Sequence, residues 1–203
     1  MNAIVLPTLP SIGTEMEGGY FGGIINVNGT HKGVIWAPKK EGQITSILLP
    51  SGKSVDGAGS PFDCVANTEA LIKAGSPAAM QIAELEINGV KGWVIPSRDV
   101  VELGYRHFKP CSYQNYCSWR DGENNNSVPP GWLYTPELPA QTSLAAFQDG
   151  GDESFDEAWY ATSTVLPSGK TAFYQGFSLG NQSGDRLSAE CRVRAVKLIH
   201  LGS

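Results

Sequence analysis

Charged residues are scarce in this chain, and basic residues are scarcer than acidic ones. Only 17% of the 203 residues are charged, compared with roughly 25% in an average soluble domain, and the net charge at pH 7 is −5. General nucleic-acid binding needs a basic face for the phosphate backbone, so this balance argues against it. The chain also lacks any stretch of about 18 apolar residues, so it predicts no transmembrane helix and no insertion into a membrane.

The first residues, MNAIVLPTLPSIG, lack the basic region with which a secretory signal peptide begins. We therefore expect no signal peptide. Pro7 and Pro10 interrupt the apolar run and exclude a helix. A short apolar segment without a core of its own often docks on a neighbour. We expect residues 1–17 to be an extended attachment segment that binds a partner chain, and residues 18–201 to form a single domain.

Metal-binding patterns are missing as well. The chain has four cysteines: Cys64, Cys111, Cys117 and Cys191. Five residues separate the closest pair, which does not fit a zinc site. Free buried thiols are the first expectation, and a Cys111–Cys117 or Cys64–Cys191 disulfide in an oxidising compartment is the alternative. The three histidines are scattered, and His107 falls near the end of a predicted helix, where the helix dipole favours a cation.

Two motifs resemble catalytic or metal sites without meeting their requirements. GFSLG, residues 176–180, matches G-x-S-x-G, but that motif needs its serine between a strand and a helix. The polar stretch GNQSGD, residues 180–185, predicts a turn instead. The acidic stretch 149–157 offers carboxylates for Ca²⁺ but no recognised ligand spacing, so a solvated loop is expected. We therefore expect no enzyme activity, no cofactor and no metal.

Glycine and proline are abundant, with 24 and 13 residues, which favours a loop-rich, mainly β fold. Asn28-Gly29 between two apolar runs predicts a β-hairpin.

Helical patterns cover 67–75, 76–87 and the residues after Ser97, and strand patterns cover 158–164, 171–179 and 190–199. The expected N-caps are Asn67 or Thr68, Ser76 and Ser97. In the last strand, Arg192 and Arg194 alternate with apolar residues and are expected on the outer face. Strands, helices, a long loop and further strands predict an α+β domain.

Regular periodicity disappears between Cys111 and Asp152. Loops of this length are usually functional or disordered, and the aromatic residues here argue against disorder. Aromatic side chains can stack on sugars or anchor a protein interface, although they can equally pin a loop to the body of the protein. The candidate binding residues are Tyr116, Trp119, Arg120, Asp121, Asn124, Asn125, Trp132 and Tyr134.

Several segments, in order, resemble one bacterial and phage domain family. They are GGYFGGIINVNGTHKGVIWAPK, NTEALIKAGSPAA, GWVIPSRDVVELGY, AWYATST and RVRAVK. This family is typified by the C-terminal domain of a collagen-like adhesin and has a C-type-lectin-like fold. Val100 or Val101 stands near a position where the family usually has an acidic residue. The lead-in and the long loop resemble the phage and prophage branch.

The resemblance implies twisted antiparallel strands with two or three helices and a long irregular loop insert. AWYATST would be a core strand near the closing strand, with Trp159 as its anchor and its hydroxyls bonded to backbone groups of the long loop region. The implied function is a non-catalytic virion component, made in the host cytoplasm: a tail-associated receptor-binding or accessory protein.

The alternative is a decoration protein that binds only other virion proteins. An enzyme of the formylglycine-generating fold class is a distant third, because its catalytic cysteines do not align with the four present. The expected partners are other virion proteins, held through the N-terminal segment, and a host glycan or protein. A homotrimer is also consistent with the family.

Overall fold

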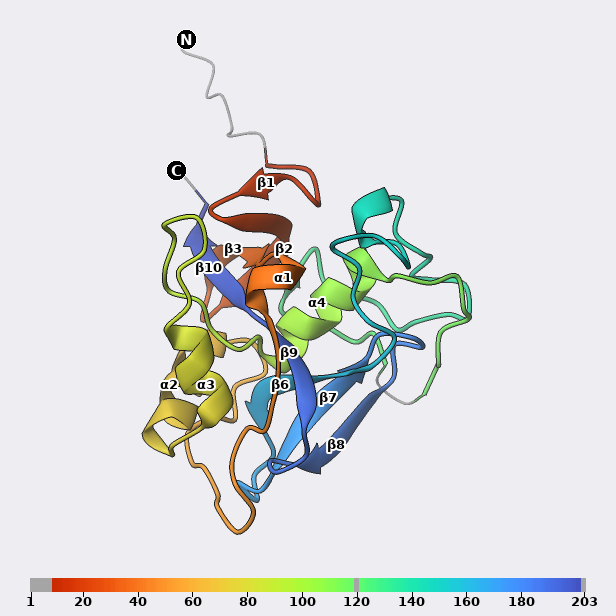
Figure 1. Ribbon diagram of the computed structural model, residues 1–203. Coiled ribbons are helices and arrows are strands. Elements are labelled where there is room, and N and C mark those ends of the chain that lie inside the picture. The colour runs from red at the N-terminus through yellow and green to blue at the C-terminus, as the bar shows by residue number, and fades with distance from the viewer. Residues whose placement is uncertain (1–8, 119–120, 202–203) are drawn as a thin grey trace.

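The computed structural model describes residues 9–118 and 121–201, and it shows an α+β protein with two five-stranded sheets and four α-helices in this part of the chain (Figure 1). The α+β class predicted from the order of elements is confirmed. The candidate residues Trp119 and Arg120 lie outside the described residues, as does the segment 1–8.

The first sheet joins the beginning of the chain to its end. It contains β1 (Glu15–Met16), β2 (Gly19–Val27), β3 (Thr30–Trp36) and β10 (Val196–His200) in that order, and β5 (Ser127–Val128) pairs with β2. The predicted hairpin is confirmed. Asn28 and Gly29 both have positive φ, 52° and 85°, as the tight turn between β2 and β3 requires.

The second sheet has the order β4 (Gln43–Ser46), β9 (Cys191–Arg194), β6 (Trp159–Val165), β7 (Thr171–Gly176) and β8 (Gln182–Arg186). Its pairs are antiparallel except β6 with β9, which is parallel. The predicted turn at 180–185 is wrong in part, because this stretch supplies β8. Its sequence carries little strand propensity, and pairing with β7 along its whole length supplies the structure.

Four helices lie between the strands in sequence, and most of the predicted positions are correct. They are α1 (Lys39–Gly42), α2 (Cys64–Lys73), α3 (Pro77–Ala83) and α4 (Arg98–Phe108), followed by the 3₁₀ turn η1 (Ala145–Phe147). Ser76 caps α3 as predicted, since its side chain accepts a hydrogen bond from the Ala79 amide. Asn67 and Thr68 do not cap α2. Asp63 does, and the two residues lie buried inside the helix.

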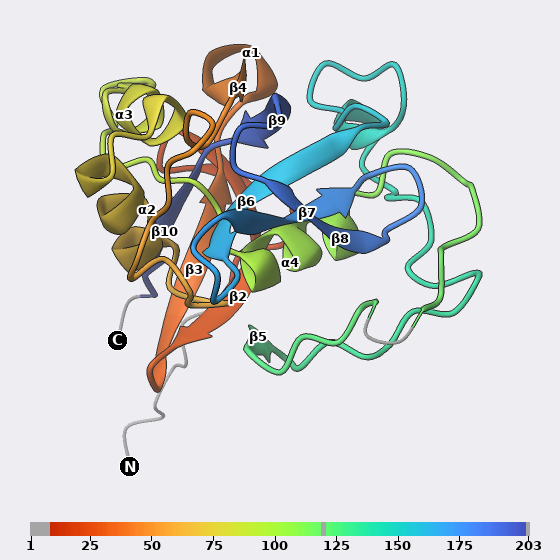
Figure 2. The same ribbon diagram turned by 90° about the horizontal axis from the view of Figure 1, so that it is seen from below.

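Helix α4 lies against β2 of the first sheet (Figure 2). The Trp36 side chain of β3 lies between them. A Cβ atom added to Gly22 of β2 would lie 2.3 Å from the indole ring, and one added to Gly104 of α4 would lie 2.4 Å from it. The two glycines therefore make the space that the indole fills. Ser97 occupies the N-cap position of α4, but its hydroxyl makes no capping bond. His107, expected as a cation, is bonded through Nδ1 to the Gly22 carbonyl, and burial lowers its pKa, which favours the neutral ring.

The second half of the expected attachment segment belongs to the folded body. Ile12 and Met16 pack against the core, and the Gly13 amide donates to the Phe21 carbonyl at 2.8 Å. β1 then pairs with β2.

The position of Arg194 contradicts the prediction that it lies on the outer face. Its side chain is fully buried and binds the Glu153 carboxylate, the Glu153 carbonyl at 2.7 Å and the Ala37 carbonyl at 2.8 Å. The strand pattern fails because β9 is an inner strand of the second sheet, and the segment that carries Phe147, Glu153 and Phe155 covers it at this residue.

The acidic stretch is likewise not a simple solvated loop. Besides Glu153, it contributes Asp156, which accepts bonds from Lys39, Gln43 and Arg192. Partial burial by itself would raise the pKa of Asp156, but these three hydrogen bonds lower it overall. The hydrogen bonds of Asp156 therefore join α1 and β9 to the loop that precedes β6.

Replacing Arg194 with alanine should reduce the free energy of unfolding by about 3–5 kcal/mol, because the Glu153 carboxylate would lose its buried partner. The matched control is Arg192→Ala on the same strand. Arg192 is 41% exposed in its pair with Asp156, so the cost should be at most about 1 kcal/mol. Urea unfolding measures both. If both variants lose the same free energy of unfolding, burial of Arg194 does not determine how much this residue contributes to stability.

Candidate functional site

The long insert is attached to α4 by a buried carboxylate, Glu102. This carboxylate accepts hydrogen bonds from Arg106 Nη2 and Asn124 Nδ2, both at 2.7 Å, and from the Tyr134 hydroxyl at 2.9 Å. Burial raises the pKa of Glu102, and the three donors oppose that shift. We call Glu102, Arg106, Asn124 and Tyr134 the insert anchor.

Arg106 also binds the backbone of the insert directly. Its Nη2 atom donates to the Gly122 carbonyl at 2.7 Å and to the Trp132 carbonyl at 2.9 Å. Between these positions, Asn124 and Gly131 form an antiparallel bridge. The anchor therefore holds two arms of the insert against the same face of α4.

The three consecutive asparagines have different roles. Asn124 is 1% exposed and also donates to the Asp99 carbonyl at 2.8 Å, while its own oxygen accepts from the amides of Asn126 and Ser127. Asn126 donates to the Asp99 carboxylate at 2.7 Å. Asn125 lies between them and is exposed.

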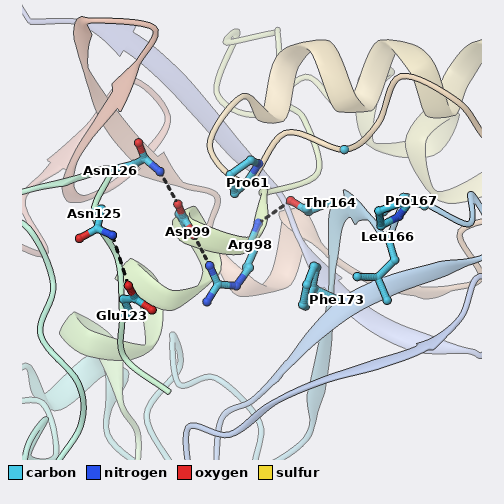
Figure 3. A pocket seen from close by; sticks show the side chains of 12 residues that line it. Pro61, Arg98, Asp99, Glu123, Asn125, Asn126, Thr164, Leu166, Pro167 and Phe173 are labelled. Atoms are coloured by element: carbon cyan, nitrogen blue, oxygen red, sulfur yellow. Dashed lines mark hydrogen bonds and ion pairs between the residues drawn. The ribbon is translucent and has the colours of Figure 1, made fainter. Parts of the chain in front are cut away.

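A groove separates the insert from the second sheet. It consists of two cavities of about 400 and 710 Å³ that share the lining residues Arg98, Leu166 and Phe173. One side of the smaller cavity is apolar and comes from the loop before α2, from β6 and β7 and from the turn between them: Pro61, Val165, Leu166, Pro167 and Phe173 (Figure 3). The other side is polar and comes mainly from the insert: Asp99, Glu123, Asn125 and Asn126.

Arg98 lies where the two cavities meet. Its guanidinium is paired with the Asp99 carboxylate at 3.1 Å, donates through Nε to the Gln182 side chain at 2.9 Å and lies 5.6 Å from the centre of the Phe173 ring. These contacts fix the side chain, which is 6% exposed. They also hold Phe173 in place as part of the apolar wall.

Hydroxyls of β6 position the first turn of α4. The Thr164 hydroxyl accepts a bond from the Arg98 amide at 2.9 Å and donates to the Ser60 carbonyl at 2.8 Å. The prediction that these hydroxyls bond backbone groups of the long loop is wrong, because Thr164 bonds the loop before α2 and the first residue of α4 instead. Trp159 does not anchor the strand, because it is 41% exposed, whereas Tyr160 is buried at 2%.

The larger cavity extends the groove along the insert toward β8. Asp121 lines it and joins its two sides, since one carboxylate oxygen accepts from the Gln182 amide at 3.0 Å and the other from the Ser118 amide at 3.2 Å. Tyr116 and Trp159 also line this cavity, and both are exposed, at 53% and 41%.

The candidate residues from the sequence fall into three groups. Tyr116, Asp121 and Asn125 line the groove. Asn124 and Tyr134 are buried in the insert anchor. Trp132 is 78% exposed and lines neither cavity of the groove.

Sequence reasoning did not identify Arg98 and Phe173 as site residues. Arg98 follows a predicted helix cap and Phe173 falls in an alternating strand, so both carry an ordinary structural pattern. Their meeting across the groove depends on the packing of α4 against β7. Ser178, the serine of GFSLG, lies in the turn between β7 and β8, with no helix after it.

The four cysteines are free thiols in the structure, as first expected, although Cys117 is exposed and Cys191 is half-buried. The described residues bring together no group of three or more histidine, cysteine or acidic side chains suited to a metal ion. Within residues 9–118 and 121–201, no helix has the length and apolar character needed to cross a bilayer.

Comparisons of the chain with protein-family models, with curated proteins and with solved structures gave no match.

Asn124→Ala should destabilise the protein by about 2–4 kcal/mol, because it removes donors to Glu102 and Asp99 and leaves buried groups without partners. Asn125→Ala is the matched control, and its exposed side chain should change stability by no more than about 0.5 kcal/mol. Thermal or urea unfolding would measure the difference. If the two variants unfold alike, Asn124 does not hold the insert as described.

Proposed function

We propose that this protein is a non-catalytic recognition module of a phage or prophage virion, associated with the tail and acting as a receptor-binding or accessory protein. The observation that supports the proposal best is the groove. Its insert wall is fixed by the insert anchor, and its lining combines apolar and hydrogen-bonding side chains. Ligand sites generally have this composition: mostly apolar surface with a few fixed polar groups that give specificity.

A rigid insert favours binding because little conformational freedom is lost when the ligand arrives. Ordering a free side chain or loop on binding costs about 0.5–1.5 kcal/mol for each immobilised side chain. In this protein Glu102 and Arg106 already hold the insert, and Asp121 and Gln182 join it to β8. The groove is therefore formed before a ligand binds.

The C-type-lectin-like fold remains part of the proposal. It is supported by the neighbours of β6, the strand that contains the AWYATST segment. β6 is central in the second sheet and lies beside β9, which leads directly into the closing strand β10. That agrees with the core position near the closing strand that the family resemblance implies.

Exposed apolar residues on the insert favour a second function, that of a decoration protein. Trp132, Leu133 and Leu138 are 78%, 58% and 61% exposed. Large exposed aromatic and aliphatic side chains are typical anchors of protein interfaces. In this alternative the partner is another virion protein or a further copy of the chain, as in a trimer, and the groove carries no receptor.

Two variants separate these functions in phage particles. Mass spectrometry of purified virions should detect the protein. Tyr116→Ala, in the groove, should reduce adsorption to host cells about tenfold while the amount in the particle stays the same, because one aromatic contact of about 1.4 kcal/mol is lost. Trp132→Ala, outside the groove, should leave adsorption unchanged.

The reverse pattern supports the alternative. If Trp132→Ala removes the protein from particles and Tyr116→Ala adsorbs normally, a decoration protein is the better assignment. Absence of the wild-type protein from purified virions would contradict both functions.

A further inference from the structure

We propose that the exposed side chains of Tyr113, Leu138 and Leu179 form one docking patch for a second virion protein, whose contact surface is apolar at its centre and basic at its edge. This inference rests on the proposed function as a virion component. It adds the surface through which the module is attached to the particle and the chemistry of the partner.

Exposed apolar side chains are concentrated on the insert. Ten large hydrophobic side chains are exposed in residues 9–118 and 121–201, and half of them belong to the insert: Tyr113, Tyr116, Trp132, Leu133 and Leu138. The three members of the docking patch are 54%, 61% and 39% exposed, in the order Tyr113, Leu138 and Leu179. Single apolar side chains on a surface need no explanation, whereas a contiguous group of them marks an interaction site.

Backbone hydrogen bonds bring the parts of the docking patch together. The Tyr116 amide donates to the Leu179 carbonyl at 2.7 Å, and the Asn115 amide donates to the Pro136 carbonyl at 2.8 Å. The first arm of the insert is therefore bonded both to the turn between β7 and β8 and to the segment just before Leu138. Side chains far apart in the sequence become neighbours on one surface.

A buried lysine holds this surface from below. Lys109 follows α4 directly and is 2% exposed, and its Nζ atom donates to the Asn115 side chain at 2.8 Å and to the Pro139 carbonyl at 3.2 Å. The Asn115 oxygen also accepts from the Tyr105 hydroxyl at 2.7 Å, and its nitrogen donates to the Thr135 carbonyl at 3.0 Å. The docking patch is therefore ordered before a partner arrives, and little conformational freedom is lost on binding.

The edge of the docking patch is acidic. Glu137 is exposed and precedes Leu138 in the chain. Glu157 is also exposed and lies close to Cys111: burial raises the pKa of that thiol, and the Glu157 carboxylate raises it further. The Cys111 thiol donates to the turn between β7 and β8 at 3.3 Å, which places this carboxylate beside the patch.

These charges favour a basic edge on the partner. Within the described part of the chain, neither Glu137 nor Glu157 forms an ion pair. The buried Lys109 offsets only one of the two carboxylates. Lysine or arginine side chains around the apolar centre of a partner would therefore be attracted to this surface.

A second copy of the chain is a poorer occupant. In a two-fold contact the docking patch would face itself, and the two acidic edges would meet. Like charges opposed across an interface are unfavourable. The net charge of −5 also makes two copies repel each other before they touch. The partner is therefore a different protein.

The test counts copies of the protein in each purified virion by quantitative mass spectrometry. Tyr113→Ala and Leu138→Ala should each lower the number about tenfold, because an apolar anchor is lost. Glu137→Lys should lower it about fivefold, because the new charge would repel a basic edge.

Met80→Ala and Glu84→Lys are the matched controls and should leave the number unchanged. Both residues are exposed, on α3 or at its end, and α3 lies on the opposite side of the molecule from the insert (Figure 1 and Figure 2). Thermal unfolding checks that every variant folds, and the exposed Glu137 and Leu138 supply changes that leave the core intact.

Three results would overturn the inference. Wild-type numbers of both alanine variants in virions would contradict the position of the docking patch, and a wild-type number of Glu137→Lys would contradict the basic edge of the partner. Sedimentation that shows an oligomer of the purified chain, dissociated by Leu138→Ala, would make a second copy the occupant. Failure of the proposed function is seen separately, as absence of the wild-type protein from virions.

Discussion

The arrangement of the two sheets depends on one buried ion pair, Arg194 with Glu153. The guanidinium binds the carbonyl that follows β3, the backbone and carboxylate of Glu153, and the face of the Phe155 ring at 4.6 Å. A buried arginine is unfavourable unless its donors find partners, so these segments must meet in one geometry. The pair thereby fixes where the chain crosses from the second sheet into the first.

The groove follows from this geometry through a series of hydrogen-bonded contacts. β9 lies beside β6, and Thr164 of β6 binds the first turn of α4. α4 then presents Arg98 to the groove and, one and two turns later, Glu102 and Arg106 to the insert. The irregular segment is therefore held by a helix that is itself positioned by the sheet, which explains how so long a loop keeps a defined shape.

Local signals in the sequence predicted local structure well. The Asn28-Gly29 turn and the Ser76 cap are correct because each depends on the conformations open to a few neighbouring residues. Non-local contacts decided the errors. Arg194 alternates like an outward residue but is buried under the segment that carries Glu153 and Phe155, and β8 forms because β7 offers it a partner.

The same distinction applies to the candidate site. Composition identified the insert as the segment to examine, but it could not separate exposed residues from buried ones. Tyr134 and Asn124 have side chains that are typical of a binding surface, but both are buried and donate hydrogen bonds to the Glu102 carboxylate. Phe173, an ordinary strand residue by pattern, forms a wall of the groove because α4 places Arg98 against it.

The contact of Trp36 with Gly22 and Gly104 has a consequence for how this sequence can diverge. The indole leaves no room for a side chain at either glycine, although the glycines are 82 positions apart in the chain. A change at one glycine is tolerated only after the indole has been replaced by a smaller group, and that replacement releases the other glycine as well. The three positions should therefore change together among descendants of this chain, as a correlated set that links the first hairpin to α4.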